Sequence, residues 1–196
     1  EMGVTISNKN GLPADENGDI VKANAFTDFF KNLFGSKESG DIKTDMMVQL
    51  KKHEGYKAYP YKDTEGKWTI GIGHLIGDGS TKGSYAQYSK SNPMTDADVQ
   101  DLFNEDYEEH VNIAKGYPAF DKLNDSGRKA LIDLTFNMGD LTRGWPNTLA
   151  MLNSGDFEGA AKAIEGSKYA KQVGNRAKTI AKQIRNAEII KSDVEA

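Results

Sequence analysis

Residues 61–75, YKDTEGKWTIGIGHL, differ in character from the sequence on either side of them and decide the fold. Aromatic residues, Thr and Ile favour β-strands. The strand pattern is interrupted at residues 63–66, where Asp comes first and Gly fourth, as in a β-turn. After the turn, Trp68, Ile70 and Ile72 alternate with small or polar residues, so they are expected on one face of a strand. The segment therefore predicts a small antiparallel sheet with a tight turn.

Helical patterns lie on both sides of this sheet. Apolar residues with helical spacing predict a helix over residues 45–54, which Gly55 ends, and a long helix over about 95–115, for which Thr95 is the N-cap. Further helices are expected at about 126–138 (with Ser126 as the cap), 146–153, 156–165 and 174–190.

This order of elements predicts an α+β fold. A small antiparallel β lobe occupies about 55–94, and a larger α-helical lobe occupies about 116–190 together with helix 45–54. The long helix at about 95–115 joins the two lobes. Clefts between such lobes are common ligand sites, so we expect the binding site there.

The composition excludes several classes of protein. The chain has 196 residues, which is one domain or one domain plus an extension. Cysteine is absent, which excludes disulfides, thiolate zinc sites, iron–sulfur clusters and a cysteine nucleophile. The three histidines lack metal-ligand spacing, which argues against a metallopeptidase. No stretch approaches about 18 apolar residues, so no transmembrane segment is expected, and no signal peptide opens the chain.

Charge is unevenly distributed along the chain, whose net charge is −4. Residues 92–125 contain nine acids and two bases, whereas residues 162–191 contain eight bases and two acids. The basic segment would attract an anionic polymer, although a solvated helix face is the simpler interpretation. Nucleic acid is not an expected partner, because the sequence has no basic-aromatic motif for phosphates and bases.

Residues 1–44 are expected to form an N-terminal extension. Residues 1–22 are rich in Asn, Gly, Asp and Lys and predict a linker or arm. Within residues 23–34, four phenylalanines and Leu33 fall on one helical stripe. This helix is expected to dock on its own domain or on a neighbouring chain, with a membrane-surface helix as the alternative. Glu1-Met2 is not a usual start, so we expect the sequence to be a fragment or a processed chain.

Three polar residues around the predicted sheet suggest chemistry. Glu54 ends a helix, where the negative end of the helix dipole disfavours an ionised carboxyl group and so suits a proton donor. Asp63 lies on a turn, where an ionised carboxylate is better solvated. Thr69 shares a strand face with glycines, and the open space beside its hydroxyl would hold a water molecule. Taken one at a time, Glu54 is an ordinary surface acid, Asp63 a turn former and Thr69 a strand residue. Taken together, two carboxyl groups in unlike environments are the arrangement found in glycoside hydrolases.

Several of these motifs resemble those of a known family. Glu54-Gly55 together with residues 61–66 and 68–75 resembles the signature of the T-even type of phage lysozymes, glycoside hydrolase family 24. The resemblance continues at residues 102–104 (LFN), 136–139 (FNMG) and 175–178 (NRAK). It covers about residues 45–190, which places a lysozyme domain at 45–196 after the extension.

The resemblance implies muramidase activity on peptidoglycan glycan strands. The bond cleaved would be the β-1,4 link between N-acetylmuramic acid and N-acetylglucosamine, with inversion at the anomeric carbon and without a metal or organic cofactor. By position, Glu54 is the general acid, Asp63 the second carboxylate and Thr69 the water-orienting hydroxyl. An inverting pair of carboxyl groups is expected to stand roughly 6.5–9.5 Å apart.

The resemblance also implies supporting roles. Arg176 has the position of an arginine that pairs with the catalytic Glu; its charge would lower the pKa of Glu54, whereas burial and the helix dipole would raise it. His74 and Asp106 match a buried ion pair between the β lobe and the long helix. The sugar-binding positions are Leu75, Phe136, Asn137 and Thr148. The sequence departs from the family pattern at His53, Ala163 and Tyr169 and in its acidic net charge.

Other interpretations remain open. The domain could be a catalytically weak module that binds peptidoglycan or serves as a structural part of a phage particle. A lytic transglycosylase would cleave the same bond, but it has no need of a positioned water. The motifs also fit both a free endolysin and a tail-associated lysozyme, which would act in the host periplasm or from the virion.

Overall fold

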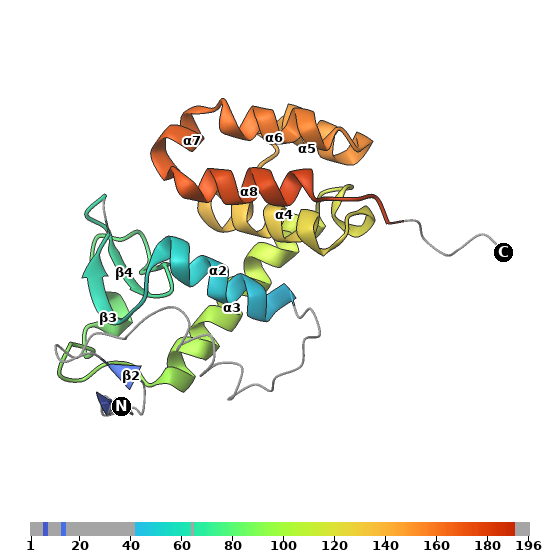
Figure 1. The fold of residues 1–196 in the computed structure, drawn as a ribbon. Helices are drawn as coiled ribbons and strands as arrows, with labels where there is room; N and C mark the ends of the chain where they lie inside the picture. Colours follow the sequence, from blue (N-terminus) through green and yellow to red (C-terminus); the bar gives the residue numbers. More distant parts are fainter. Residues whose placement is uncertain (1–5, 8–12, 15–41, 64, 191–196) are drawn as a thin grey trace. The chain divides into compact units, whose positions relative to one another are not determined.

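The computed structural model describes residues 6–7, 13–14, 42–63 and 65–190 (Figure 1). These residues form seven α-helices, a three-stranded antiparallel sheet and a short two-stranded pairing, which confirms the α+β fold. They divide into two compact units, and each is described by itself. Met47–Phe103 belong to the first unit with the two N-terminal strands, and Ile42–Met46 belong to the second with the chain from Asn104 onwards.

The three-stranded sheet lies in the first unit. Strands β3 (Lys57–Lys62), β4 (Trp68–Gly71) and β5 (His74–Leu75) are antiparallel, with β4 in the centre. The predicted turn is confirmed, because the Gly66 N–H donates to the Asp63 carbonyl at 3.0 Å. The alternation after the turn is shorter than predicted: β4 ends at Gly71, where φ is +64°, and the chain turns there toward β5.

Two helices border this sheet in the sequence. Helix α2 (Ile42–Glu54) begins three residues earlier than predicted and ends where Gly55 takes a φ of +81°. Helix α3 (Asp96–Lys115) begins with the predicted cap. The Thr95 hydroxyl accepts from the Asp98 N–H at 3.1 Å, and the Asp98 carboxylate accepts from the Thr95 N–H at 3.2 Å, which is a reciprocal capping box.

The second unit is helical. It contains the rest of α3 and the helices α4 (Asp125–Met138), α5 (Pro146–Ser154), α6 (Phe157–Glu165), α7 (Lys168–Val173) and α8 (Asn175–Arg185). Figure 1 shows α8 alongside α4 and α6, which both pack against it. Fully buried Leu and Ile side chains form this core, among them Leu131, Leu152, Ile164 and Ile180. At the surface, Arg185 contacts Glu158 and Glu165 of α6 at 2.8 Å, which ties α8 to α6.

Two predictions about these helices were wrong. Ser126 does not cap α4, because the Asn124 side chain accepts from the Gly127 N–H, while the Ser126 hydroxyl donates to the Gln183 carbonyl of α8. The helix predicted over about 174–190 is α8, which ends five residues earlier at Arg185, and α7 before it was not predicted. The chain leaves α8 after Arg185 because residue 189 pairs with Leu123 in a β-bridge.

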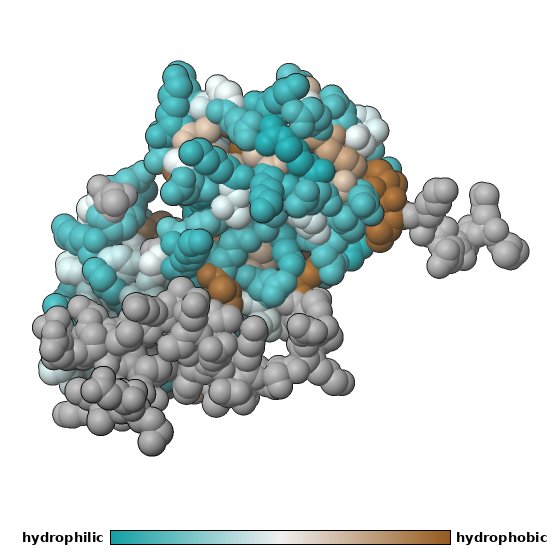
Figure 2. Space-filling view, in the orientation of Figure 1, coloured by the Kyte–Doolittle hydropathy of each residue, from teal (hydrophilic) through white to brown (hydrophobic). Residues whose placement is uncertain are grey.

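Part of the N-terminal segment is described. Strands β1 (Ile6–Ser7) and β2 (Pro13–Ala14) pair antiparallel within the predicted linker. The predicted phenylalanine-rich helix at 23–34 lies outside the described residues. In the part of the chain that is described, no helix combines the length and the apolar character needed to cross a membrane. Figure 2 shows a largely hydrophilic surface, with a brown area beside the last described residues, where Ile189 and Ile190 are exposed.

Candidate active site

All three predicted catalytic residues lie in the first unit. Glu54 is the last residue of α2, where the backbone carbonyls of the helix end give a negative partial charge. The turn closes immediately after it, because the Gly55 N–H donates to the Lys51 carbonyl at 3.0 Å. Glu54 is therefore the residue at which the helix ends, as predicted from the sequence.

Asp63 is held by the turn between β3 and β4. Its Oδ1 atom accepts from the Glu65 N–H at 2.9 Å and from the Lys67 N–H at 2.8 Å. The Asp63 N–H in turn donates to the Lys67 carbonyl at 2.9 Å. Because these bonds come from backbone groups, the orientation of the carboxylate is fixed by the turn and not by neighbouring side chains.

Thr69 lies in β4 and differs from expectation. Its side chain is only 4% exposed, whereas the sequence suggested open space beside the hydroxyl. The reason is the sheet register: Tyr61 of β3 and Leu75 of β5 lie directly opposite Thr69 on either side. Residues opposite one another share a face, so two larger side chains flank the small one.

One residue connects Asp63 with Thr69 through its backbone. The Lys67 N–H donates to the Asp63 carboxylate, and the Lys67 carbonyl accepts from the Thr69 hydroxyl at 3.4 Å. The Asp63 carboxylate and the Thr69 hydroxyl are therefore both hydrogen-bonded to the backbone of Lys67. Sequence analysis did not identify Lys67, because its contribution comes from main-chain atoms and not from its side chain.

Arg176 forms a buried ion pair in the second unit. Its Nε atom donates to Asp133 Oδ1 at 2.6 Å, and its Nη2 donates to the Asp133 carbonyl at 3.3 Å. The two side chains are 6% and 0% exposed. Asp133 was not singled out from the sequence, although an acid inside the apolar run Leu131-Ile132-Asp133-Leu134 was a signal that could have revealed it.

The remaining predicted residues are distributed over both units. In the first unit, His74 packs edge-on against Tyr85 with ring centroids 5.6 Å apart, and Leu75 is 42% exposed. In the second, Phe136 packs against His110, Asn137 is exposed, Asp106 is half-buried and Thr148 is buried. The His74–Asp106 pair and the sugar-binding positions stay predictions. Among the described residues, no group of three or more His, Cys, Asp or Glu is arranged to hold a metal ion.

A charged cluster adjoins Glu54 in the first unit, and sequence analysis missed it. The Lys51 Nζ atom lies 4.2 Å from the centre of the Tyr56 ring, and the Tyr56 hydroxyl donates to Asp96 at 3.4 Å. Burial lowers the pKa of Lys51 to about 7, partly opposed by the negative charge of Asp96. Burial also raises the pKa of Tyr56 and of Asp96.

Comparison with known proteins identifies the family. A family model described as "Phage lysozyme" matches residues 51–188, which include Glu54, Asp63 and Thr69. The chain belongs to the phage lysozyme family. This phage-type lysozyme is accordingly a glycoside hydrolase, and the family implies peptidoglycan as its substrate.

Curated relatives agree with this assignment. The lysozyme is 29% identical over 138 residues to "Probable T4-type lysozyme 2" of Dictyostelium discoideum, which covers 62% of this chain and 75% of the relative. It is 28% identical over 126 residues to the "Endolysin" of Salmonella phage P22, covering 63% and 80%. It is also 32% identical over 154 residues to the "Pre-baseplate central spike protein Gp5" of Enterobacteria phage T4, covering 69% of this chain and 26% of that protein.

Proposed function

We propose that this lysozyme hydrolyses the β-1,4 bond between N-acetylmuramic acid and N-acetylglucosamine, with inversion at the anomeric carbon. Glu54 donates a proton to the glycosidic oxygen as the bond from that oxygen to the anomeric carbon breaks. A water molecule attacks the opposite face of the sugar, and Asp63 accepts its proton. Thr69 orients that water.

The main support for this proposal is the family match, which spans residues 51–188 and so includes all three residues. The structure adds that Asp63 and Thr69 both bond to the backbone of Lys67, so a carboxylate and a hydroxyl are held at one turn. A general base and a hydroxyl that act on the same water molecule need such a fixed relation.

The supporting residues extend the proposal. By resemblance, Arg176 tunes the acidity of Glu54, and His74 and Asp106 have a structural role. Leu75, Phe136, Asn137 and Thr148 contact the sugar chain. The exposure of Leu75 and Asn137 suits a sugar contact, whereas the burial of Thr148 suits packing as well as binding.

The test compares the wild type with Glu54→Gln and Asp63→Asn on a peptidoglycan suspension. We expect each variant to lose at least about a hundredfold in clearing rate, because general acid–base catalysis contributes factors of that size. Glu65→Gln, which alters an exposed acid on the same turn, is the matched control and should clear normally. Equal clearing by wild type and Glu54→Gln would overturn the assignment of the acid.

Product analysis tests the stereochemistry and the reaction class. Proton NMR of the first products should show the α-anomer for an inverting enzyme acting on a β bond. Mass spectrometry should show reducing ends. Anhydro ends would instead indicate a lytic transglycosylase.

A second candidate function is a weakly active or inactive module that binds peptidoglycan. The burial of Thr69 favours it, because a shielded hydroxyl has less access to a water molecule. Sedimentation of the protein with insoluble peptidoglycan, without any release of reducing ends by the wild type, would support this candidate.

The biological setting is a separate proposal. We infer that the protein degrades the bacterial wall for a phage, in the host periplasm at lysis or from the particle. One relative is named as an endolysin and another as a spike protein, so the comparisons allow both settings. Proteomics of purified virions separates them, since a tail-associated lysozyme is found in the particle and an endolysin is not.

A further inference from the structure

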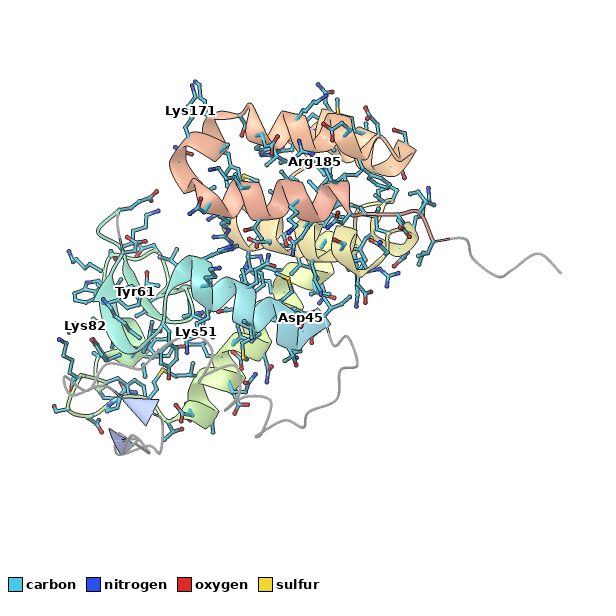
Figure 3. All side chains as sticks on the ribbon, in the orientation of Figure 1. Asp45, Lys51, Tyr61, Lys82, Lys171 and Arg185 are labelled. Carbon is cyan, nitrogen blue, oxygen red and sulfur yellow. The ribbon has the colours of Figure 1, made fainter. Side chains whose placement is uncertain are left out.

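Lys51 and Tyr56, which belong to the cluster with Asp96, lie on either side of Glu54 in the sequence. Lys51 lies one helical turn before Glu54, and Tyr56 lies two residues after it. Figure 3 labels Lys51 on α2. All three cluster residues belong to the first unit, as does Glu54.

Lys51 holds this turn at two points. Its carbonyl accepts from the Gly55 N–H at 3.0 Å, which closes the last turn of α2. Its ammonium group packs over the Tyr56 ring at 4.2 Å, on the far side of Glu54 in the sequence. Lys51 therefore contacts Gly55 through its carbonyl and Tyr56 through its ammonium group, and these are the two residues directly after Glu54. Residues 51–56 are called the Glu54 loop below.

Asp96 anchors this loop to the start of α3. Tyr56 donates to Asp96 at 3.4 Å, and the negative charge of Asp96 acts on the Lys51 ammonium group. The start of α3 is itself fixed to the sheet, because the Met94 N–H donates to the Ala58 carbonyl of β3 at 2.7 Å. The Glu54 loop is therefore connected to the start of α3, which is itself hydrogen-bonded to the sheet.

We propose that Lys51, Tyr56 and Asp96 are positioning residues, which hold the backbone of the general acid Glu54 through the charge of the Lys51 ammonium group. The inference rests on the proposed function, because it assigns the cluster to the acid of that reaction. A cation attracts both an aromatic ring and a carboxylate, whereas a neutral amine attracts neither strongly. Burial disfavours the ammonium form, whereas the contacts to Tyr56 and Asp96 favour it, so these two contacts should weaken when Lys51 loses its proton.

Lys51 loses its proton near neutral pH. Because burial lowers the pKa of Lys51 to about 7, the ammonium form is present below neutral pH and is lost above it. Two of the groups that face Lys51 are Tyr56, from the junction of α2 and β3, and Asp96, from α3. Tyr56 remains neutral in this range, since its pKa is raised above the ordinary value.

The experiment measures initial clearing rates against peptidoglycan concentration from pH 5 to pH 10. Relative to Lys51→Arg, the maximal rate of the wild type should fall by about tenfold as pH rises through 7, with little change in the half-saturating concentration. A displacement well below 1 Å suffices for a loss of this size. Lys51→Met should show the lower rate throughout, without that step. Lys51→Arg, whose charge persists, should lack this step and lose rate only as the general acid itself loses its proton, which all variants share.

Lys52→Met is the matched control, because Lys52 is an exposed lysine at the next position of the same helix and should leave the profile unchanged. Tyr56→Phe, which keeps the ring and removes the bond to Asp96, should lower the maximal rate by a smaller factor, and it provides a second test if Lys51→Met fails to fold. Circular dichroism at each pH separates unfolding from loss of rate.

The outcomes are distinguishable. A wild type that releases no reducing ends at any pH would overturn the proposed function and this inference with it. An active wild type whose profile matches those of Lys51→Met and Lys51→Arg would overturn the positioning role alone.

Discussion

Replacing Asp133 by Ala should destabilise the protein strongly. Asp133 is 0% exposed, and its carboxylate accepts from the Arg176 Nε atom at 2.6 Å, inside the helical core of the second unit. The substitution removes the carboxylate that faces the guanidinium group but leaves that group buried. Breaking a buried ion pair in this way costs about 3–5 kcal/mol of unfolding free energy. For a chain of this length, the loss corresponds to a melting temperature lower by roughly 6–20 °C.

Urea unfolding followed by circular dichroism measures the effect. Asp121→Ala, at an exposed acid in the same unit, is the control and should change the unfolding free energy by less than about 0.5 kcal/mol. Asp133→Asn should lie between the two, because the amide oxygen still accepts a hydrogen bond. The double variant Asp133→Leu with Arg176→Met should recover most of the loss. If Asp133→Ala costs under about 1 kcal/mol, the pair does not have the role that its burial indicates.

Three further predictions concern other parts of the chain. Thr95→Ala removes the hydroxyl of the capping box of α3 and should cost about 1 kcal/mol in urea unfolding; an unchanged midpoint would show that the cap contributes nothing. Because burial lowers the pKa of Lys51 from 10.5 to about 7, the unfolded chain binds more protons between these values, and the unfolding free energy of the wild type should rise with pH there. Lys51→Met should lose this rise of unfolding free energy with pH, and its gain in stability over the wild type should be largest below pH 7. If the unfolding free energies of the two proteins instead change in parallel with pH, the lowered pKa of Lys51 is contradicted. Deleting residues 1–41, which leaves α2 whole, should lower solubility, stability or association, as measured by light scattering and thermal unfolding, and a deletion variant that matches the full chain in all three would exclude a docked helix.

The sequence predicted those features that depend on neighbours in the chain. The turn at 63–66 and the cap at Thr95 follow from local hydrogen bonds, and both are confirmed. The α+β order follows from the periodicity of apolar residues, which differs between strands and helices. Ser126 shows the limit of such reasoning, because Asn124, two residues earlier, is an equally good cap and Ser126 bonds instead to a distant helix.

The features that the sequence did not predict depend on contacts across the fold. Thr69 is buried because β3 and β5 place Tyr61 and Leu75 opposite it, and the strand pattern alone does not give that register. The Lys51–Tyr56–Asp96 cluster joins residues up to 45 positions apart. Helix α7 was not predicted, because its six residues are too few to show an apolar period.

The hydrogen bonds that Lys67 makes through its backbone do not depend on which side chain this residue carries. Both Asp63 and Thr69 are bonded to the amide and carbonyl of this residue, and every amino acid except proline supplies both groups. The exposed side chain could therefore be exchanged, in evolution or by an engineer, for an acid, an aromatic ring or a cysteine carrying a fluorescent label, while the turn keeps its geometry. Position 67 thus offers a place beside the proposed catalytic residues at which affinity for differently charged walls can be tuned separately from the chemistry.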